Sequence, residues 1–108
     1  MNAPQRSADG MALDRLAKAG SDLSKVHHVD FLLNFPTQKA AERAANQLVA
    51  LAFATKTEHG KTDNDWVVKG SKRMFPVESD LMGLRDKLEA IAASEHGVYV
   101  GWRADVVR

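Results

Sequence analysis

The chain has 108 residues, the length of a single domain, and this is enough to bury a substantial hydrophobic core. Fifteen Lys and Arg against fourteen Asp and Glu leave a formal charge of +1, so charge alone requires neither nucleic acid nor a membrane as partner. The absence of cysteine excludes disulfides, thiolate metal sites and a cysteine nucleophile, and no apolar run is long enough to cross a membrane, which predicts a cytoplasmic protein.

The N-terminal part of the chain divides into a polar stretch and a helical one. Residues 1–9 have little to bury and are expected to form a disordered arm. Apolar side chains then recur at near-helical spacing, with Asp9 placed as the expected N-cap. We therefore expect residues 10–25 to form a helix and turn, ahead of a main domain over residues 26–108.

The stretch Val26–Phe35 predicts a half-buried strand, because apolar side chains alternate there with polar ones. Pro36 then marks its end. The expected inner face carries Val29, Phe31, Leu33 and Phe35. The expected outer face carries His28, Asp30, Leu32 and Asn34.

The rest of the chain predicts two helices and three strands. An alanine-rich stripe indicates a helix over Thr37–Ala52 that packs closely on a sheet, with Thr37 or Asn34 as its cap. Phe53–Glu58 and Asp65–Met74 flank a polar, glycine-containing turn and are expected to form a hairpin. A helix follows from Pro76 to about Ser94, and a last strand begins at Val98.

Two details of these strands are predicted from simple rules. Gly70, inside the third strand, is expected to mark a bulge or the strand's end. In the last strand, alternation places Tyr99 and Arg103 on the outer face. The same alternation points Val98, Val100 and Trp102 inward.

This order predicts an α+β fold of the ferredoxin-like βαββαβ type, a four-stranded antiparallel sheet with two helices on one face, plus a short N-terminal helix. Right-handed crossovers place the first and third strands at the centre. The expected core comprises Val29, Phe31, Leu33, Leu48, Trp66, Val68, Leu84, Leu88, Ile91, Val98 and Trp102. The uncovered side of the sheet is expected to carry His28, Asp30, Leu32, Val67, Lys69, Tyr99 and Arg103.

No reaction motif stands out. His28 and Asp30 share a strand face at a spacing that could hold a cation, but a solvated polar pair explains them more simply. Ser71 follows a glycine without the context of a nucleophile elbow. The densest basic group is explained by an ordinary solvated surface: Lys69, Lys72 and Arg73. The sequence thus predicts a non-enzymatic protein with no catalytic residue, metal or cofactor.

Three blocks of the sequence resemble the regulator of ribonuclease activity B family. Leu16–Asp30 resembles that family's N-terminal helix, Gly-Ser-Asp turn and His-containing strand start. Leu51–Phe53 resembles its helix-to-strand junction, with Ala52 where the family has Gly. His96–Trp102 resembles its Tyr-Asp-Gly-Trp signature, with Val100 in place of Asp.

The resemblance implies a non-catalytic regulator that binds ribonuclease E and slows RNA turnover, as a monomer or homodimer and without a membrane. Members of that family can carry an acidic C-terminal tail, which these 108 residues do not contain. For Trp102 a place in the core is a second explanation. The residues expected to form the partner-binding surface are His28, Asp30, Tyr99, Gly101, Trp102 and Arg103.

Two alternatives remain open. RNA-binding modules of the same strand order stack bases on sheet aromatics. Here Tyr99 is the one aromatic expected on the uncovered face, with Lys69 and Arg103 nearby. The other alternative is a ferredoxin-like dimerising or ligand-sensing module that pairs this face with a second copy, for which the sequence shows no motif.

Overall fold

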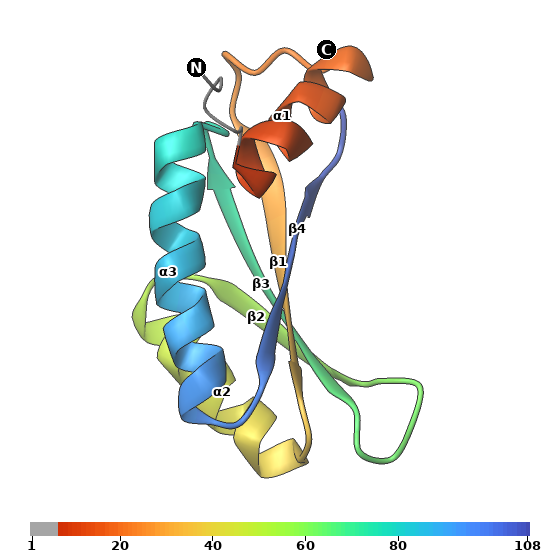
Figure 1. Ribbon diagram of the computed structural model, residues 1–108, viewed down its shortest axis with the longest axis vertical. Helices are drawn as coiled ribbons and strands as arrows, with labels where there is room; N and C mark the ends of the chain where they lie inside the picture. The colour runs from red at the N-terminus through yellow and green to blue at the C-terminus, as the bar shows by residue number, and fades with distance from the viewer. Residues whose placement is uncertain (1–6) are drawn as a thin grey trace, which may run out of the picture.

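The computed structural model describes residues 7–108 and has an α+β fold, with three helices and four strands within that range. The elements are α1 (Ala8–Lys18), β1 (His27–Phe35), α2 (Gln38–Ala50), β2 (Ala54–His59), β3 (Trp66–Met74), α3 (Glu78–Ser94) and β4 (Val98–Ala104). The strands form one antiparallel sheet in the order β2-β3-β1-β4 (Figure 1). The ferredoxin-like order is confirmed, with β1 and β3 at the centre.

The central strand β1 has the predicted alternation of burial. Val29, Phe31 and Leu33 are fully buried on the face that α2 and α3 cover, and Phe35 is nearly so. The Phe31 ring meets the Phe53 ring edge to face, with 5.6 Å between centroids. Helix α2 is capped by the Thr37 side chain, one of the two caps expected, and closes this core with small residues and one large one: Ala41, Ala44 and Leu48.

Gly70 is neither a bulge nor a strand end, which corrects the prediction. It lies in the middle of β3, in regular pairing with Phe31 of β1 and Thr55 of β2. A Cβ atom at this position would approach Leu48 Cδ1 at 3.3 Å and Phe53 Cδ1 at 3.4 Å. The missing side chain is therefore explained by the close approach of the helix layer to the sheet.

Helix α1 begins earlier than predicted. Ser7 is the N-cap, and its side chain accepts a hydrogen bond from the Gly10 N–H at 3.0 Å. Asp9 lies inside the first turn and is buried, so its assignment as the cap was wrong. Of the expected arm, residues 1–6 lie outside the described part of the chain. The helix packs on α3 and buries Leu13 in the core.

A bulge in β4 overturns the predicted alternation. Leu32 pairs with Gly101, but the next residue of β1, Leu33, pairs with Tyr99. Val100 is therefore an extra residue with no partner opposite it. Gly101 has a φ of +146°, a backbone conformation that favours glycine.

The bulge reverses which side chains of β4 point inward. Tyr99 is buried on the helix side rather than placed on the uncovered face. Val98 and Val100 are 63% and 57% exposed, so both predictions of an inward position were wrong. Beyond the bulge the predicted alternation holds: Trp102 pairs with Phe31 and packs against the core, and Arg103 pairs with Asp30 on the uncovered face.

Candidate functional site

The bulge also divides the residues predicted to form one partner-binding surface. The uncovered face carries His28, Asp30 and Arg103, the helix-covered face carries Tyr99 and Trp102, and Gly101 lies at the bulge between the two groups. The structure therefore contains two polar clusters, one on each side of the sheet.

The sheet-face cluster consists of His28, Asp30, Ser71 and Arg103. The Asp30 carboxylate accepts a hydrogen bond from Ser71 Oγ at 2.7 Å and lies 3.0 Å from His28 Nε2. Arg103 Nε is 3.8 Å from its second oxygen. Ser71 and Arg103 sit directly opposite Asp30 on β3 and β4. Strand pairing therefore holds this carboxylate from both sides.

The electrostatics of this cluster favour an ionised carboxylate beneath two exposed side chains. Partial burial opposes ionisation of Asp30, but the Ser71 hydrogen bond and the positive charges of Lys69 and His28 hold the pKa of its carboxyl below the ordinary value. The Asp30 side chain is 18% exposed, whereas His28 and Arg103 are 59% and 67% exposed. Two hydrogen-bond donors, His28 and Arg103, thus lie at the surface above the less exposed Asp30 carboxylate.

A shallow hollow adjoins the sheet-face cluster along the uncovered face. It has a volume of about 310 Å³, and Arg103, Lys69 and the apolar side chains of Leu32 and Val67 line it. Lys56 and Glu58, which form an ion pair of 3.0 Å, complete the lining. By the strand register, none of the Phe, Tyr or Trp side chains of the described strands points to this face.

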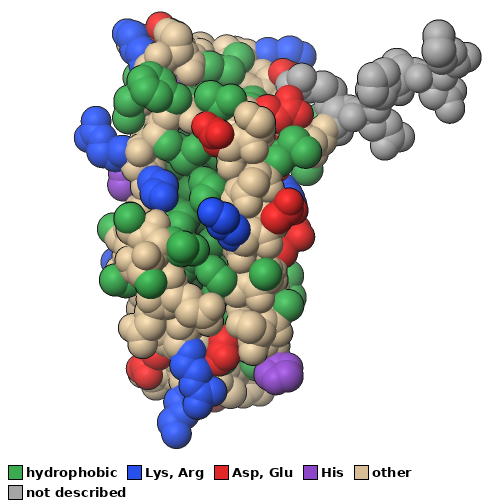
Figure 2. Space-filling view, turned by 90° about the vertical axis from the view of Figure 1, so that its left-hand side faces the viewer, with side chains coloured by type: hydrophobic (Ala, Val, Ile, Leu, Met, Phe, Trp, Pro, Cys, Tyr) green, Lys and Arg blue, Asp and Glu red, His purple; other side chains and the backbone are tan. Residues whose placement is uncertain are grey.

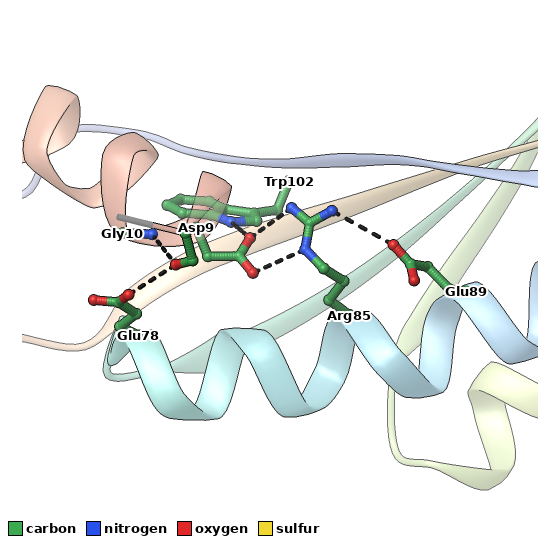
Figure 3. Close-up of polar contacts among 7 residues, drawn as sticks. Asp9, Gly10, Glu78, Arg85, Glu89 and Trp102 are labelled. Carbon is green, nitrogen blue, oxygen red and sulfur yellow. Dashed lines mark hydrogen bonds and ion pairs between the residues drawn. The ribbon is translucent and has the colours of Figure 1, made fainter. Parts of the chain in front are cut away.

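The helix-side cluster consists of Asp9, Arg85 and Trp102, which Figure 3 shows, together with Tyr99. Arg85 binds the Asp9 carboxylate through two hydrogen bonds of 2.9 Å, and Trp102 Nε1 donates a third at 3.0 Å. Asp9 is 1% exposed. The hydrogen bond from Arg85 is the main cause that lowers the pKa of Asp9 and raises that of Arg85. The cluster joins α1, α3 and β4.

Tyr99 is the fourth member of the helix-side cluster, and its ring lies against Arg85. The Arg85 guanidinium carbon lies 5.4 Å from the centroid of the Tyr99 ring. Burial raises the pKa of Tyr99 to about 12, and its hydroxyl has no hydrogen-bond partner among residues 7–108. A phenol this hard to ionise is unsuited to act as a base near neutral pH. Tyr99 is thus a packing residue rather than a contact group.

Sequence reasoning did not find the partners in the helix-side cluster. Asp9 stands in a polar stretch where a cap is the ordinary explanation, and Arg85 resembles any other solvent-facing residue of an amphipathic helix. Asp9 and Arg85 lie far apart in the sequence, so their pairing leaves no periodic pattern in it. The pairing becomes visible only when α1 is placed against α3.

A buried serine and histidine also come together, at the start of β1. The Ser21 hydroxyl lies 2.5 Å from His27 Nε2, and His27 Nδ1 lies 2.8 Å from the Lys25 carbonyl oxygen. The Ser21 oxygen also accepts a hydrogen bond from the Val107 N–H at 2.9 Å. Because both side chains are buried, the contact fixes the C-terminal segment to the turn before β1.

The described residues contain no group of three or more His, Asp or Glu side chains arranged to hold a metal ion. Among the same residues, no helix combines the length and apolar character needed to span a membrane.

These features define a ferredoxin-like α+β domain with three helices on one side of its sheet and a charged, accessible surface on the other. The family model described as Regulator of ribonuclease activity B matches residues 6–103, which is most of the chain. The chain belongs to this family, and the resemblance noted in its sequence is confirmed. A search of curated proteins finds no match to this chain.

Proposed function

We propose that the protein is a non-catalytic regulator that binds a ribonuclease, with ribonuclease E as the expected partner, through the uncovered face of its sheet. The observation that carries the proposal is the family match over residues 6–103, because the family is described as a regulator of ribonuclease activity. The fold adds a surface suited to a protein partner.

The composition of the uncovered face supports a protein partner. The apolar side chains of Leu32 and Val67 are partly exposed there between charged neighbours. Interfaces of regulated complexes combine apolar contact with complementary charge in this way. Asp30, held by both neighbouring strands, keeps the exposed His28 and Arg103 side chains in a defined place at little entropic cost.

The position of Tyr99 weakens the RNA-binding alternative. Base stacking needs an accessible aromatic ring, and the ring expected to supply it is buried on the opposite side of the sheet. The uncovered face retains the cations Lys69 and Arg103, which would support only salt-sensitive contact with phosphates. RNA binding is therefore an outcome of the test rather than part of the proposal.

The test compares capture of ribonuclease E with binding of a short single-stranded RNA over a salt titration. The wild-type chain should capture the nuclease, and Arg103→Glu should lose most of that capture. Lys18→Glu, which reverses an exposed charge on α1, is the matched control and should behave as wild type. RNA binding with a steep salt dependence and no nuclease capture would contradict the proposal. A stable dimer that captures neither would favour the dimerising module instead.

A further inference from the structure

A second surface lies between α2 and α3, on the side of the molecule away from the uncovered sheet face. Figure 2 shows hydrophobic side chains along the middle of this side, with Lys or Arg side chains beside them. A hollow of about 430 Å³ is lined there by Ala50 at the end of α2, by Leu51 just after it, and by Ala90 and Ile91 of α3. We call the hollow and its continuation toward β3 the interhelix groove.

The groove continues along α3 toward the end of β3. A second hollow of about 400 Å³ is lined by Met74, Gly83 and Leu84, and Lys87 lines both hollows. The two together follow one side of α3 over several turns, because Gly83, Lys87 and Ala90 recur at spacings of four and three. The groove is thus long and narrow rather than a closed cavity.

The groove exists because the two helices pack on different strands. Helix α2 packs mainly over β2 and β3 and α3 over β4 and β1, so the helices scarcely touch each other. Small residues, Ala50 on α2 and Gly83 and Ala90 on α3, leave the space between them unfilled. An ion pair of 3.5 Å between Arg43 and Glu95 joins the helices near the C-terminal end of α3.

The charged side chains of the groove are mainly cationic. Lys87 stands between the two hollows and forms no ion pair with any of the described residues 7–108. Lys72 lines the second hollow, where its ammonium lies 3.3 Å from the Leu51 carbonyl oxygen and 4.6 Å from the Phe53 ring centroid. Asp80 is the acidic residue of the lining, at the far end of the groove.

We propose that the interhelix groove binds an acidic amphipathic helix from a partner protein. Its apolar side chains, one turn apart, would enter the two hollows, and its flanking carboxylates would meet Lys87 and Lys72. A second copy of this chain fits less well, since a two-fold contact through the groove would bring Lys87 against its own symmetry mate. The proposal concerns a different face from the one assigned to the nuclease and does not depend on it.

The probe is a fluorescein-labelled synthetic peptide of about four helical turns, with Leu at positions i, i+3, i+4 and i+7 and Glu on both flanks. A matched peptide carries Lys in place of every Glu. Fluorescence anisotropy at low salt should show binding of the Glu peptide, and the Lys peptide should bind at least about tenfold more weakly. Binding should weaken as salt is raised. Equal binding of both peptides, or no binding of either, would overturn the proposal.

Substitutions in the groove locate the binding. Lys87→Glu should weaken binding of the Glu peptide about threefold to tenfold, since it replaces an attraction by a repulsion at a partly screened site. Ala90→Glu, at an exposed helix position that tolerates the side chain, should fill the first hollow and abolish binding. Lys18→Glu on α1 is the control and should leave the affinity unchanged.

Thermal unfolding of each variant shows whether the fold persists, and Ala90→Gln supplies bulk without charge if Ala90→Glu does not fold. Unchanged peptide affinity in folded Lys87→Glu and Ala90→Glu would overturn the assignment to the groove. Capture of ribonuclease E by Arg103→Glu is measured separately, so failure of either proposal leaves the other standing.

Discussion

Each face of the sheet carries an Asp–Arg pair, and the two pairs differ in burial and in distance. On the helix side Arg85 grips Asp9 through two bonds of 2.9 Å, and the side chains are 30% and 1% exposed. On the uncovered side Arg103 lies 3.8 Å from Asp30, with 67% and 18% exposure. Burial, not residue type, decides that the first pair holds helices together and that the second remains accessible at the surface.

The energetics of ion pairs make this difference measurable. Breaking a buried pair leaves an uncompensated charge and costs about 3 to 5 kcal/mol, whereas exposed pairs contribute about 0 to 1 kcal/mol. Substitutions in the helix-side cluster should therefore change stability, and those in the sheet-face cluster should change binding.

Trp102→Ala should destabilise the protein most, by about 3 to 5 kcal/mol, because it removes a large side chain packed against the core and a hydrogen bond to a buried carboxylate. Denaturant titration followed by circular dichroism measures the change. Trp102→Phe, which keeps most of the packing, is the control. An unchanged unfolding midpoint in Trp102→Ala would show that this side chain does not support the fold.

Arg85→Ala should lower the free energy of unfolding by about 2 to 3 kcal/mol, less than for a fully buried pair because Arg85 is 30% exposed. The buried Asp9 carboxylate would keep Trp102 as its hydrogen-bond donor among residues 7–108. Asp9→Ala should cost less, because Arg85 is partly exposed and keeps Glu89 at 3.6 Å. Chemical denaturation of the two variants checks the order. The reverse order would mean that α1 is held chiefly by packing.

Ala52→Gly, outside both clusters, calibrates the stability scale and should raise the free energy of unfolding by about 1 kcal/mol. Ala52 follows α2 with a φ of +69°, a conformation in which a Cβ atom is unfavourable and glycine is not. This is the position where the family's pattern has Gly. Differential scanning calorimetry should show a higher melting temperature, and Ala50→Gly, at the last residue of the helix, should lower it.

The pH dependence of stability should reflect Asp9. Its pKa is lowered in the folded protein, so its ionised form contributes stability that is fully present above its unfolded pKa of about 3.9. That contribution is lost as the pH falls through the lowered pKa. Urea titrations between about pH 5 and pH 2 should show a shallower loss for Asp9→Asn than for wild type. Parallel curves would show that the carboxylate contributes nothing by its charge.

Asp30→Ala should change the free energy of unfolding only slightly, by under about 1 kcal/mol, because water can solvate the exposed partners that it leaves behind. The matched comparison is Asp9→Ala measured by the same chemical denaturation. A loss as large as that of Asp9→Ala would remove the distinction between the two faces.

Much of the fold could be predicted because its signals are local and periodic. Alternation in β1, the Thr37 cap and the apolar stripe of α3 each follow from neighbours in sequence, and the crossover rule then gives the strand order. The predicted ends of the helices and strands were less accurate, as at α1, where Ser7 rather than Asp9 caps the helix.

Only part of the candidate site could be predicted, because one extra residue in β4 changes the sheet face to which the residues before it point. Two glycines lie in strands, and the sequence predicts a bulge or strand end at Gly70 but none at Gly101. Gly70 proved to be a place of close packing, whereas Gly101 marks the bulge that turns Tyr99 inward. The bulge does not change the sheet face of the other predicted residues, since His28 and Asp30 lie on the regular strand β1 and Arg103 follows the bulge.

The most direct measurement pairs two quantities for one variant: the unfolding free energy of Arg103→Glu and its capture of ribonuclease E. We predict a stability within about 0.5 kcal/mol of wild type together with loss of capture, because the side chain is exposed and faces the proposed partner. Full capture by a folded Arg103→Glu would contradict the assignment of the uncovered face.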